Sequence, residues 1–370
     1  MKIHAAIVPA EGADFELTAV DLDEPRDDEL LVRIHAVGIC HTDVAAQHGV
    51  FGLPFPALFG HEGAGVVERT GAAVRGFAAG DRVAVSFRSC GECPTCAGGL
   101  PSYCDLMGQL NYAGARPDGS HMIHRDGQPV SAAFFGQSSF ATHVLTSTRN
   151  CVKLPDGVPF AVAAPLGCSA QTGAGSIFNA LACRPGSSLL ITGAGAVGLC
   201  AVMAAKLAGC HPVIVAEPLA ARRDLALQLG ATHAVDPATG ELSAAVRRIA
   251  PAGVDHALDT SGRPDILDQA MAALAIRGVL ALVGIPPDEA ALPGRMMNFI
   301  ASGQMVRGVI EGDADPATFL PLLMQYYLDG RFPLDRFVSL YDAAQINEAI
   351  ADQKAGRCVK PVLLMADVSS

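Results

Sequence analysis

The sequence of 370 residues has no tryptophan, only five tyrosines and a charged fraction of only 17%. Its acidic residues outnumber the basic ones by 37 to 26, which gives a formal net charge of −11. This shortage of positive charge argues against nucleic acid and anionic membranes as partners, because both are bound mainly through lysine and arginine. Fifteen phenylalanines remain as the main aromatic residues that could line an apolar site.

We expect no segment that directs the chain into a membrane. The N-terminal residues 1–8 lack the long apolar core of a signal peptide, which predicts a cytoplasmic protein. Residues 185–205 carry no charge and could be read as a membrane span, but three central glycines and the following Lys206 argue against that reading. In a cytosolic chain, eleven cysteines of which several cluster favour metal binding over disulfides.

The length and the 50% hydrophobic content predict two domains with large cores. Residues 1–160 are typical of β-structure, with short apolar runs separated by glycine and proline. After residue 185 strands and helices alternate, which predicts a parallel sheet. The expected elements there are helices 219–229, 242–249, 264–275 and 315–328, strands 233–235, 254–259, 278–284 and 305–310, and a strand 359–364 returning to the first domain.

A glycine-rich turn stands between an apolar run and a helix-forming run, as Gly193-Ala-Gly195-Ala-Val-Gly198. In a dinucleotide-binding turn these glycines permit the tight turn, the approach of the pyrophosphate and close helix–strand packing, respectively. Glu217 ends the next apolar run and is placed to hold both ribose hydroxyls. An ordinary glycine-rich loop is the alternative, but the following acid favours a dinucleotide site.

Four cysteines follow the spacing C-x2-C-x2-C-x7-C, at Cys90, Cys93, Cys96 and Cys104. Four thiolates complete the tetrahedral shell of zinc and leave no open position, which predicts a structural zinc site. An iron–sulfur cluster or a redox-active pair are alternatives, but nothing else in the sequence indicates electron transfer.

Three further residues, Cys40, His61 and Cys168, each lie beside a predicted strand or turn. Taken alone, a cysteine that follows a strand is usually a core residue, and a histidine beside a glycine is usually a turn residue. Together, two thiolates and one imidazole leave the fourth zinc position open, which is typical of a catalytic site. The other cysteines lack metal spacing and are expected to be small apolar residues: Cys151, Cys183, Cys200, Cys210 and Cys358.

The motifs GICHTD, GHEGAGVV, PLGCSAQTGAGSIFN and GAGAVG, together with the four-cysteine segment, resemble in order those of the zinc-dependent medium-chain alcohol dehydrogenases. The resemblance covers nearly the whole chain and is nearest to the aryl (benzyl) alcohol branch. It implies an α/β protein with a GroES-like catalytic domain, residues 1–169 and 310–370, and a Rossmann domain, residues 170–309. The substrate would bind between them, and the chain would form a dimer or tetramer with two zinc ions and NAD per subunit.

The resemblance also assigns roles around the catalytic metal. Cys40, His61 and Cys168 match its ligands, and Glu62 matches an acid behind it that can replace a ligand. Asp43 matches the carboxylate that orients the histidine ligand, and Thr42 the hydroxyl that takes the alcohol proton. The histidine that ends the proton relay in some members falls at Ala45. The relay is therefore expected to pass through the ribose hydroxyl to solvent or to His48.

For the cofactor, the resemblance implies contacts from the glycine turn, Glu217 and a further set: His41, Thr172, Val197, Arg222, Val283 and Lys360. His41 stands where many members have an arginine on the pyrophosphate. We therefore expect a weaker positive charge at the pyrophosphate, looser binding of NAD and faster product release. Lys360 is expected at a second phosphate contact. Glu217 replaces the commoner aspartate and should still repel a 2′-phosphate, which favours NAD over NADP although Arg222 and Arg223 lie close in sequence.

The expected reaction is reversible oxidation of a primary aromatic alcohol to its aldehyde. The substrate is expected against residues that include four phenylalanines: Phe51, Phe87, Leu110, Phe134, Phe135, Ile285 and Val309. Oxidation of terpenols or aliphatic alcohols is an alternative. A glutathione-dependent formaldehyde enzyme is disfavoured because its members have an acid where Phe51 stands. A non-catalytic nucleotide-binding relative is disfavoured because no catalytic zinc ligand is lost.

Overall fold

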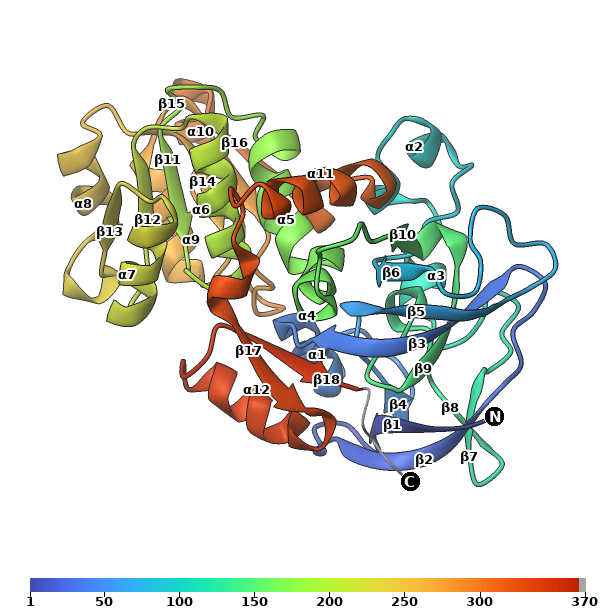
Figure 1. Ribbon diagram of the computed structural model, residues 1–370. Coiled ribbons are helices and arrows are strands. Elements are labelled where there is room, and N and C mark those ends of the chain that lie inside the picture. Colours follow the sequence, from blue (N-terminus) through green and yellow to red (C-terminus); the bar gives the residue numbers. More distant parts are fainter. Residues whose placement is uncertain (366–370) are drawn as a thin grey trace. The chain divides into compact units, whose positions relative to one another are not determined.

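The computed structural model describes residues 1–365. The chain divides into two compact units (Figure 1). Unit 1 contains Met1–Cys168 and the chain from Asp315 onwards, and unit 2 contains Ser169–Ala314. The sequence analysis placed these boundaries after residues 169 and 309.

Unit 1 is built on two sheets whose strands come from both ends of the chain. The first has the order β4-β1-β2-β7-β8 and the second β10-β6-β5-β3-β18-β17, with β9 also paired to β3. The strands of the first sheet are β1 (Lys2–Val8), β2 (Glu16–Leu22), β4 (Ala57–Leu58), β7 (Ile123–Arg125) and β8 (Gln128–Val130). Those of the second are β3 (Glu29–Gly38), β5 (Gly63–Thr70), β6 (Arg82–Val85), β9 (His143–Ser147), β10 (Cys151–Lys153), β17 (Val338–Asp342) and β18 (Lys360–Leu364).

Strand β3 organises the second sheet. Its apolar run is almost entirely buried, and it pairs with β5 through one edge and with β9 and β18 through the other. The pairing of Val362 with Gly38 confirms that the C-terminal strand returns to the first part of the chain. The helices of this unit are short, apart from the last two: α1 (His41–Gln47), α2 (Pro94–Ala97), α3 (Met107–Asn111), α4 (Phe160–Ala163), α11 (Pro316–Leu328) and α12 (Ile346–Lys354).

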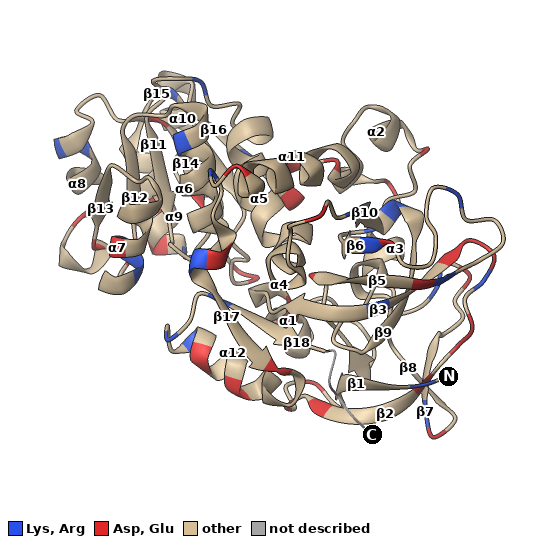
Figure 2. Ribbon diagram, in the orientation of Figure 1, with Lys and Arg blue, Asp and Glu red and all other residues tan. Residues whose placement is uncertain are grey.

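Unit 2 is a parallel sheet of six strands in the order β13-β12-β11-β14-β15-β16. Its neighbouring inner strands β11 and β12 carry no charged residue (Figure 2), as expected for strands covered on both faces. The strands are β11 (Leu189–Thr192), β12 (Val213–Ala216), β13 (His233–Val235), β14 (Val254–Asp259), β15 (Leu274–Leu282) and β16 (Met305–Gly308). The helices are α5 (Ser169–Gly175), α6 (Ala196–Ala208), α7 (Ala220–Leu229), α8 (Leu242–Ile249), α9 (Pro264–Ala273) and α10 (Met296–Ser302).

The strand order is that of a doubly wound dinucleotide-binding sheet, and it confirms the expected architecture of this unit. The alternation expected after residue 185 is confirmed within a few residues at each element, but helix α10 was not expected. Residues 185–205 form β11, a turn and part of α6 rather than one long helix. Among the described residues, we find no helix with the length and apolarity that crossing a bilayer requires.

The second boundary lies five residues later than the sequence suggested, because the turn Glu311–Asp313 belongs to unit 2. Its residues bond to α5 and to the π-helical turn Ser176–Ala180 that follows it. The Gln171 amide donates to the Glu311 carboxylate, and the Asn179 amide donates to the Gly312 carbonyl. These contacts keep the turn with the parallel sheet.

Arg116 is a buried cation of unit 1 whose replacement we expect to be costly. Its guanidinium contacts Glu29 at 2.7 Å and Asp23 at 2.8 Å. Arg116→Met leaves the buried Glu29 carboxylate without this partner and should lower the free energy of unfolding by about 3–5 kcal/mol. Denaturant unfolding followed by circular dichroism measures the loss. The control is Lys2→Met, which removes the exposed pair with Asp21 and should cost less than about 1 kcal/mol. Equal losses would contradict the prediction.

Candidate active site

Four potential metal ligands gather in unit 1, on loops that follow or precede the strands of the second sheet. The ligand atoms of Cys40, His61, Glu62 and Cys168 all lie within 4.8 Å of one another. Cys40 follows β3, His61 and Glu62 precede β5, and Cys168 follows a short turn after α4. The structure thus brings together the three residues that the sequence marked as catalytic zinc ligands.

His61 is oriented by Asp43, as the sequence predicted for these two residues. His61 Nδ1 lies 2.8 Å from Asp43 Oδ1, and both side chains are fully buried. The same carboxylate accepts hydrogen bonds from the backbone amides of Cys40 and Gly60, each at 3.0 Å. A proton held at Nδ1 leaves Nε2, which lies 3.2 Å from Cys168 Sγ, free to donate its lone pair to a metal.

The Cys40 thiol of this cluster is suited to the thiolate form that binds metals. A hydrogen bond with Cys168 lowers the pKa of Cys40 well below its usual range, against the opposing effect of burial, and His61 adds to the lowering. Soft thiolates and an imidazole are ligands that zinc prefers. The donor set therefore fits zinc. Thr42 Oγ1 lies 3.5 Å from Cys40 Sγ, so the hydroxyl predicted to take the alcohol proton lies beside the cluster.

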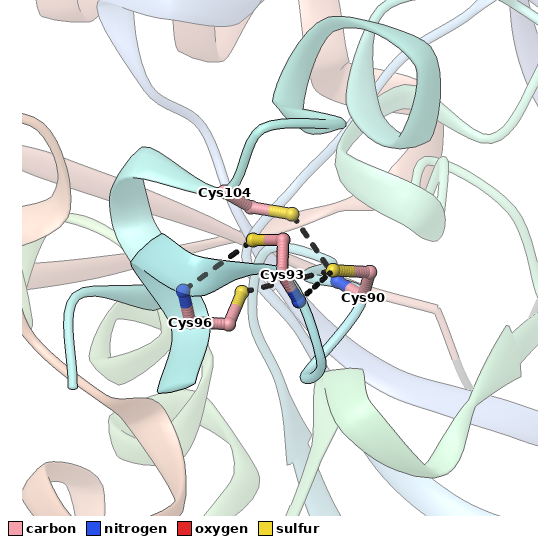
Figure 3. Close-up of side chains that lie close together, drawn as sticks. All are labelled: Cys90, Cys93, Cys96 and Cys104. Carbon is pink, nitrogen blue, oxygen red and sulfur yellow. Dashed lines mark hydrogen bonds between the residues drawn. The ribbon is translucent and has the colours of Figure 1, made fainter. Parts of the chain in front are cut away.

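A second cluster is formed by Cys90, Cys93, Cys96 and Cys104, whose sulfur atoms lie within 4.8 Å of one another (Figure 3). Cys90 Sγ and Cys96 Sγ are 3.9 Å apart, close to the roughly 3.8 Å that two thiolates have around a tetrahedral zinc. Backbone amides of Glu92 and Cys93 lower the pKa of Cys90 to about 6. The four residues therefore fit a closed zinc site.

The glycine turn of unit 2 has the geometry that its sequence predicted. Gly193 has a φ of +94°, and a Cβ at Gly198 would lie 2.0 Å from the Gly193 carbonyl oxygen. A Cβ at Gly195 would meet nothing within 4 Å, so space lies open where a pyrophosphate would approach. The turn therefore fits the phosphates of a dinucleotide at the N-terminus of α6.

Glu217 follows β12 and is held next to that turn. Its carboxylate accepts hydrogen bonds from the amides of Ala194 at 2.8 Å and Leu219 at 2.9 Å, and a carboxylate oxygen retains further acceptor capacity for ribose hydroxyls. Arg223 donates to the carbonyl oxygens of Glu217 and Pro218 and pairs with Asp236, so its charge is engaged away from the Glu217 carboxylate.

The profiles of two protein families match this chain. The profile of the alcohol dehydrogenase GroES-like domain matches residues 26–156, and that of the zinc-binding dehydrogenases matches residues 196–325. A geraniol dehydrogenase of Castellaniella defragrans is 43% identical over 366 residues, which cover 98% of each chain. The chain belongs to the zinc-dependent medium-chain alcohol dehydrogenases.

Solved structures give the same result. A zinc-binding-domain alcohol dehydrogenase from Burkholderia ambifaria is 43% identical, with a TM-score of 0.96 over 99% of both chains. The benzyl alcohol dehydrogenase of Acinetobacter calcoaceticus is 40% identical, with a TM-score of 0.95 over 99% of this chain and 100% of the other. A protein of Sinorhizobium meliloti 1021 solved with NADP is 25% identical, with a TM-score of 0.81 over 98% and 99%. The predicted fold class and the predicted zinc and nicotinamide nucleotide cofactors of this alcohol dehydrogenase are confirmed.

Lys360 has partners in this alcohol dehydrogenase that the sequence analysis did not foresee. Its buried ammonium lies 2.8 Å and 2.7 Å from the two Glu62 oxygens and donates to the Ile39 carbonyl. Burial lowers the pKa of Lys360, but attraction to Glu62 outweighs it, so the pKa is raised above its usual range. The resemblance implied a phosphate contact, whereas the structure shows this lysine bound to the acid behind the predicted metal site.

Two aromatic rings pack against His61. Phe135 stacks on the imidazole with ring centres 4.4 Å apart, and Phe134 meets it edge-on at 5.7 Å. Phe51 lies 5.8 Å from Phe134 and stacks on Tyr112 at 5.1 Å. Tyr112 was not predicted, because a single tyrosine on a short helix-to-loop segment gives no periodic signal. We call Phe51, Tyr112, Phe134 and Phe135 the aromatic cluster.

The remaining predicted residues lie in several places. Phe87 and Leu110 are buried in unit 1. Ile285 and Val309 lie in unit 2, shortly after β15 and β16, and Val283 directly follows β15. Val197 is in the first turn of α6, Arg222 is in the first turn of α7, and Thr172 is buried in α5 with Oγ1 3.4 Å from Glu311 Oε2. His41 and His48 are exposed at the two ends of α1.

The two cysteine clusters are predicted to respond differently to the loss of one thiol. Cys168→Ala removes a ligand from an open site, so the variant should stay folded with one zinc per chain instead of two and almost no turnover. Cys96→Ala opens a closed site and should lower the free energy of unfolding by several kcal/mol. Metal analysis, thermal unfolding and activity measure these outcomes. A Cys96→Ala protein with unchanged unfolding but lost activity would show that the two roles were assigned wrongly.

Proposed function

We propose that this alcohol dehydrogenase oxidises a primary benzyl-type alcohol to its aldehyde, reversibly and with NAD. The aromatic cluster beside His61 is the observation that carries this proposal. Ring faces and edges favour a flat substrate, and each aromatic pair contributes about 0.5–1.5 kcal/mol beyond simple area burial. Phe87, Leu110, Ile285 and Val309 are proposed to complete the substrate surroundings.

In the proposed mechanism, Cys40, His61 and Cys168 would hold zinc, which would supply the Lewis acidity that brings the pKa of a hydroxyl group toward about 7. Asp43 keeps a proton on His61 Nδ1 and so keeps the imidazole aligned. Thr42 Oγ1 accepts the alcohol proton and passes its own proton onward to solvent or to His48. The aromatic cluster excludes water from the substrate, and NAD would supply the hydride acceptor.

A terpenol is the second candidate substrate. The geraniol dehydrogenase that is 43% identical along nearly the whole chain favours it. Geraniol is also a primary alcohol next to a flat unsaturated group, so the aromatic cluster would suit its reactive end too.

Homo-oligomer formation and a cytoplasmic location stay predictions from the sequence.

The choice of NAD is predicted to depend on Glu217. Glu217→Ala removes the carboxylate from the ribose site, so the KM for NAD⁺ should rise and the preference for NAD⁺ over NADP⁺ should fall by about tenfold or more. Steady-state kinetics with both nucleotides measure this. Asp224→Ala, which removes an exposed charge from the neighbouring helix, is the control. If both variants keep the original preference, Glu217 does not contact the ribose.

The substrate class is tested by NAD⁺ reduction with benzyl alcohol, geraniol, ethanol, and formaldehyde with glutathione. We expect kcat/KM for benzyl alcohol to exceed that for ethanol by at least about a hundredfold, or roughly 2.7 kcal/mol of transition-state binding. Phe51→Ala should lower the benzyl value and leave ethanol nearly unchanged. Phe77→Ala, whose ring packs under Lys153 in the same unit, should change neither. Comparable values for benzyl alcohol and ethanol would refute the benzyl proposal, and a clearly higher value for geraniol would favour the terpenol.

A further inference from the structure

The catalytic cluster contains one potential ligand more than an open zinc site uses. A carboxylate oxygen of Glu62 belongs to a group of four ligand atoms that all lie within 4.8 Å of one another. The other three atoms come from Cys40, His61 and Cys168. Zinc with four protein ligands forms a closed site, whereas a catalytic site keeps one position for water or substrate. Because carboxylate oxygens are themselves zinc ligands, Glu62 has to be kept away from that position while an alcohol binds.

The buried ammonium of Lys360 contacts both oxygens of the Glu62 carboxylate. Lys360 Nζ lies 2.8 Å from Oε1 and 2.7 Å from Oε2. The two side chains are only 1% and 0% exposed, so water screens their attraction very little. Moving the carboxylate onto a metal would break a buried ion pair, which is costly. The lysine therefore opposes coordination of a metal by Glu62.

Contacts between the end of β3 and the start of β18 fix this ion pair in place. Lys360 Nζ also donates to the Ile39 carbonyl at 2.9 Å, and the Ile39 amide donates to the Pro361 carbonyl at 3.0 Å. The Gly38 amide donates to the Glu62 carbonyl at 3.0 Å. A Cβ at Gly38 would lie 2.0 Å from Glu62 Oε2, so the glycine leaves room for the carboxylate beside the lysine.

We propose that Lys360 is a positioning residue that holds the Glu62 carboxylate off the metal and so keeps the fourth zinc position open for the alcohol. The carboxylate stays next to the three other ligand atoms, but its oxygens are turned to a cation of the protein. This inference rests on the proposed binding of zinc by Cys40, His61 and Cys168, and it does not depend on which alcohol is oxidised.

The test uses protein in which cobalt replaces zinc, because cobalt accepts similar ligands and its visible absorption depends on their number and type. Imidazole is the probe for the open position, and its dissociation constant is measured from the change in absorption. In Lys360→Met we expect Glu62 to bind the metal. The spectrum without imidazole should therefore change, and the dissociation constant of imidazole should rise about tenfold or more.

Three further variants serve as controls. Lys354→Met removes an exposed lysine at the end of α12 and should change neither the spectrum nor imidazole binding. Lys360→Arg keeps the cation and should stay closer to the wild-type protein than Lys360→Met does. Lys360→Gln is a second neutral variant in case Lys360→Met does not fold.

A double variant shows whether the effect passes through Glu62. Lys360→Met combined with Glu62→Gln removes the competing carboxylate as well as the lysine. The dissociation constant of imidazole should then return to within about threefold of the wild-type value, because the two changes act through one contact. Equal weakening of imidazole binding in the single and the double variant would overturn the proposal.

A purely structural role of Lys360 would lower thermal stability without changing the cobalt spectrum or imidazole binding, and this result also overturns the proposal. A failure of the proposed zinc ligands is seen separately. In that case the cobalt spectrum of Cys168→Ala would equal that of the wild-type protein, whatever happens at Lys360. The two failures are therefore distinguishable.

Discussion

The predicted catalytic ligands depend on one buried carboxylate, that of Asp43. Its oxygens bind the amides of Cys40 and Gly60 and the imidazole of His61. These three groups belong to the two loops that carry the first thiol and the histidine, so a single acid sets the distance between the loops and the orientation of the ring. When the distance between the loops and the orientation of the ring are both fixed, the sulfur and nitrogen atoms point to one common centre. A metal can then bind there without rearrangement of its ligands.

One buried acid of the site, Glu62, is paired with a buried cation, although the chain as a whole is strongly acidic. Glu62 and Lys360 are separated by 298 residues in sequence and are both buried. The C-terminal strand β18 brings the lysine to Glu62 by pairing with β3, whose last residue, Gly38, has no Cβ to collide with the Glu62 carboxylate. A buried acid without such a partner is costly, so the returning strand is part of the site as well as of the sheet.

Features that depend on neighbouring residues could be predicted from the sequence, and features that depend on distant ones could not. The four-cysteine segment and the turn at Gly193 span a few residues, so spacing alone reveals them. Cys40 and Cys168 are brought together only by folding, and beforehand they were connected by their donor types and by the resemblance alone. Helix α10 gave no signal because its apolar residues, such as Met296 and Ile300, are exposed rather than arranged on one buried face. The partners of Lys360 and the ring stacking of Tyr112 follow from tertiary packing, which no local pattern encodes.

Two strained positions, Phe135 and Glu311, show why local rules fail where tertiary contacts hold the backbone. Both adopt left-handed backbone conformations, with φ of +53° and +51°. Glycine would relieve this strain of about 1–3 kcal/mol per residue, as it does at Gly193. Glycine would also remove the ring that stacks on His61 or the carboxylate that binds Gln171. A side chain kept at such cost must contribute more through its contacts than the backbone loses. For Phe135, one such contact is the stacking on the predicted metal ligand His61.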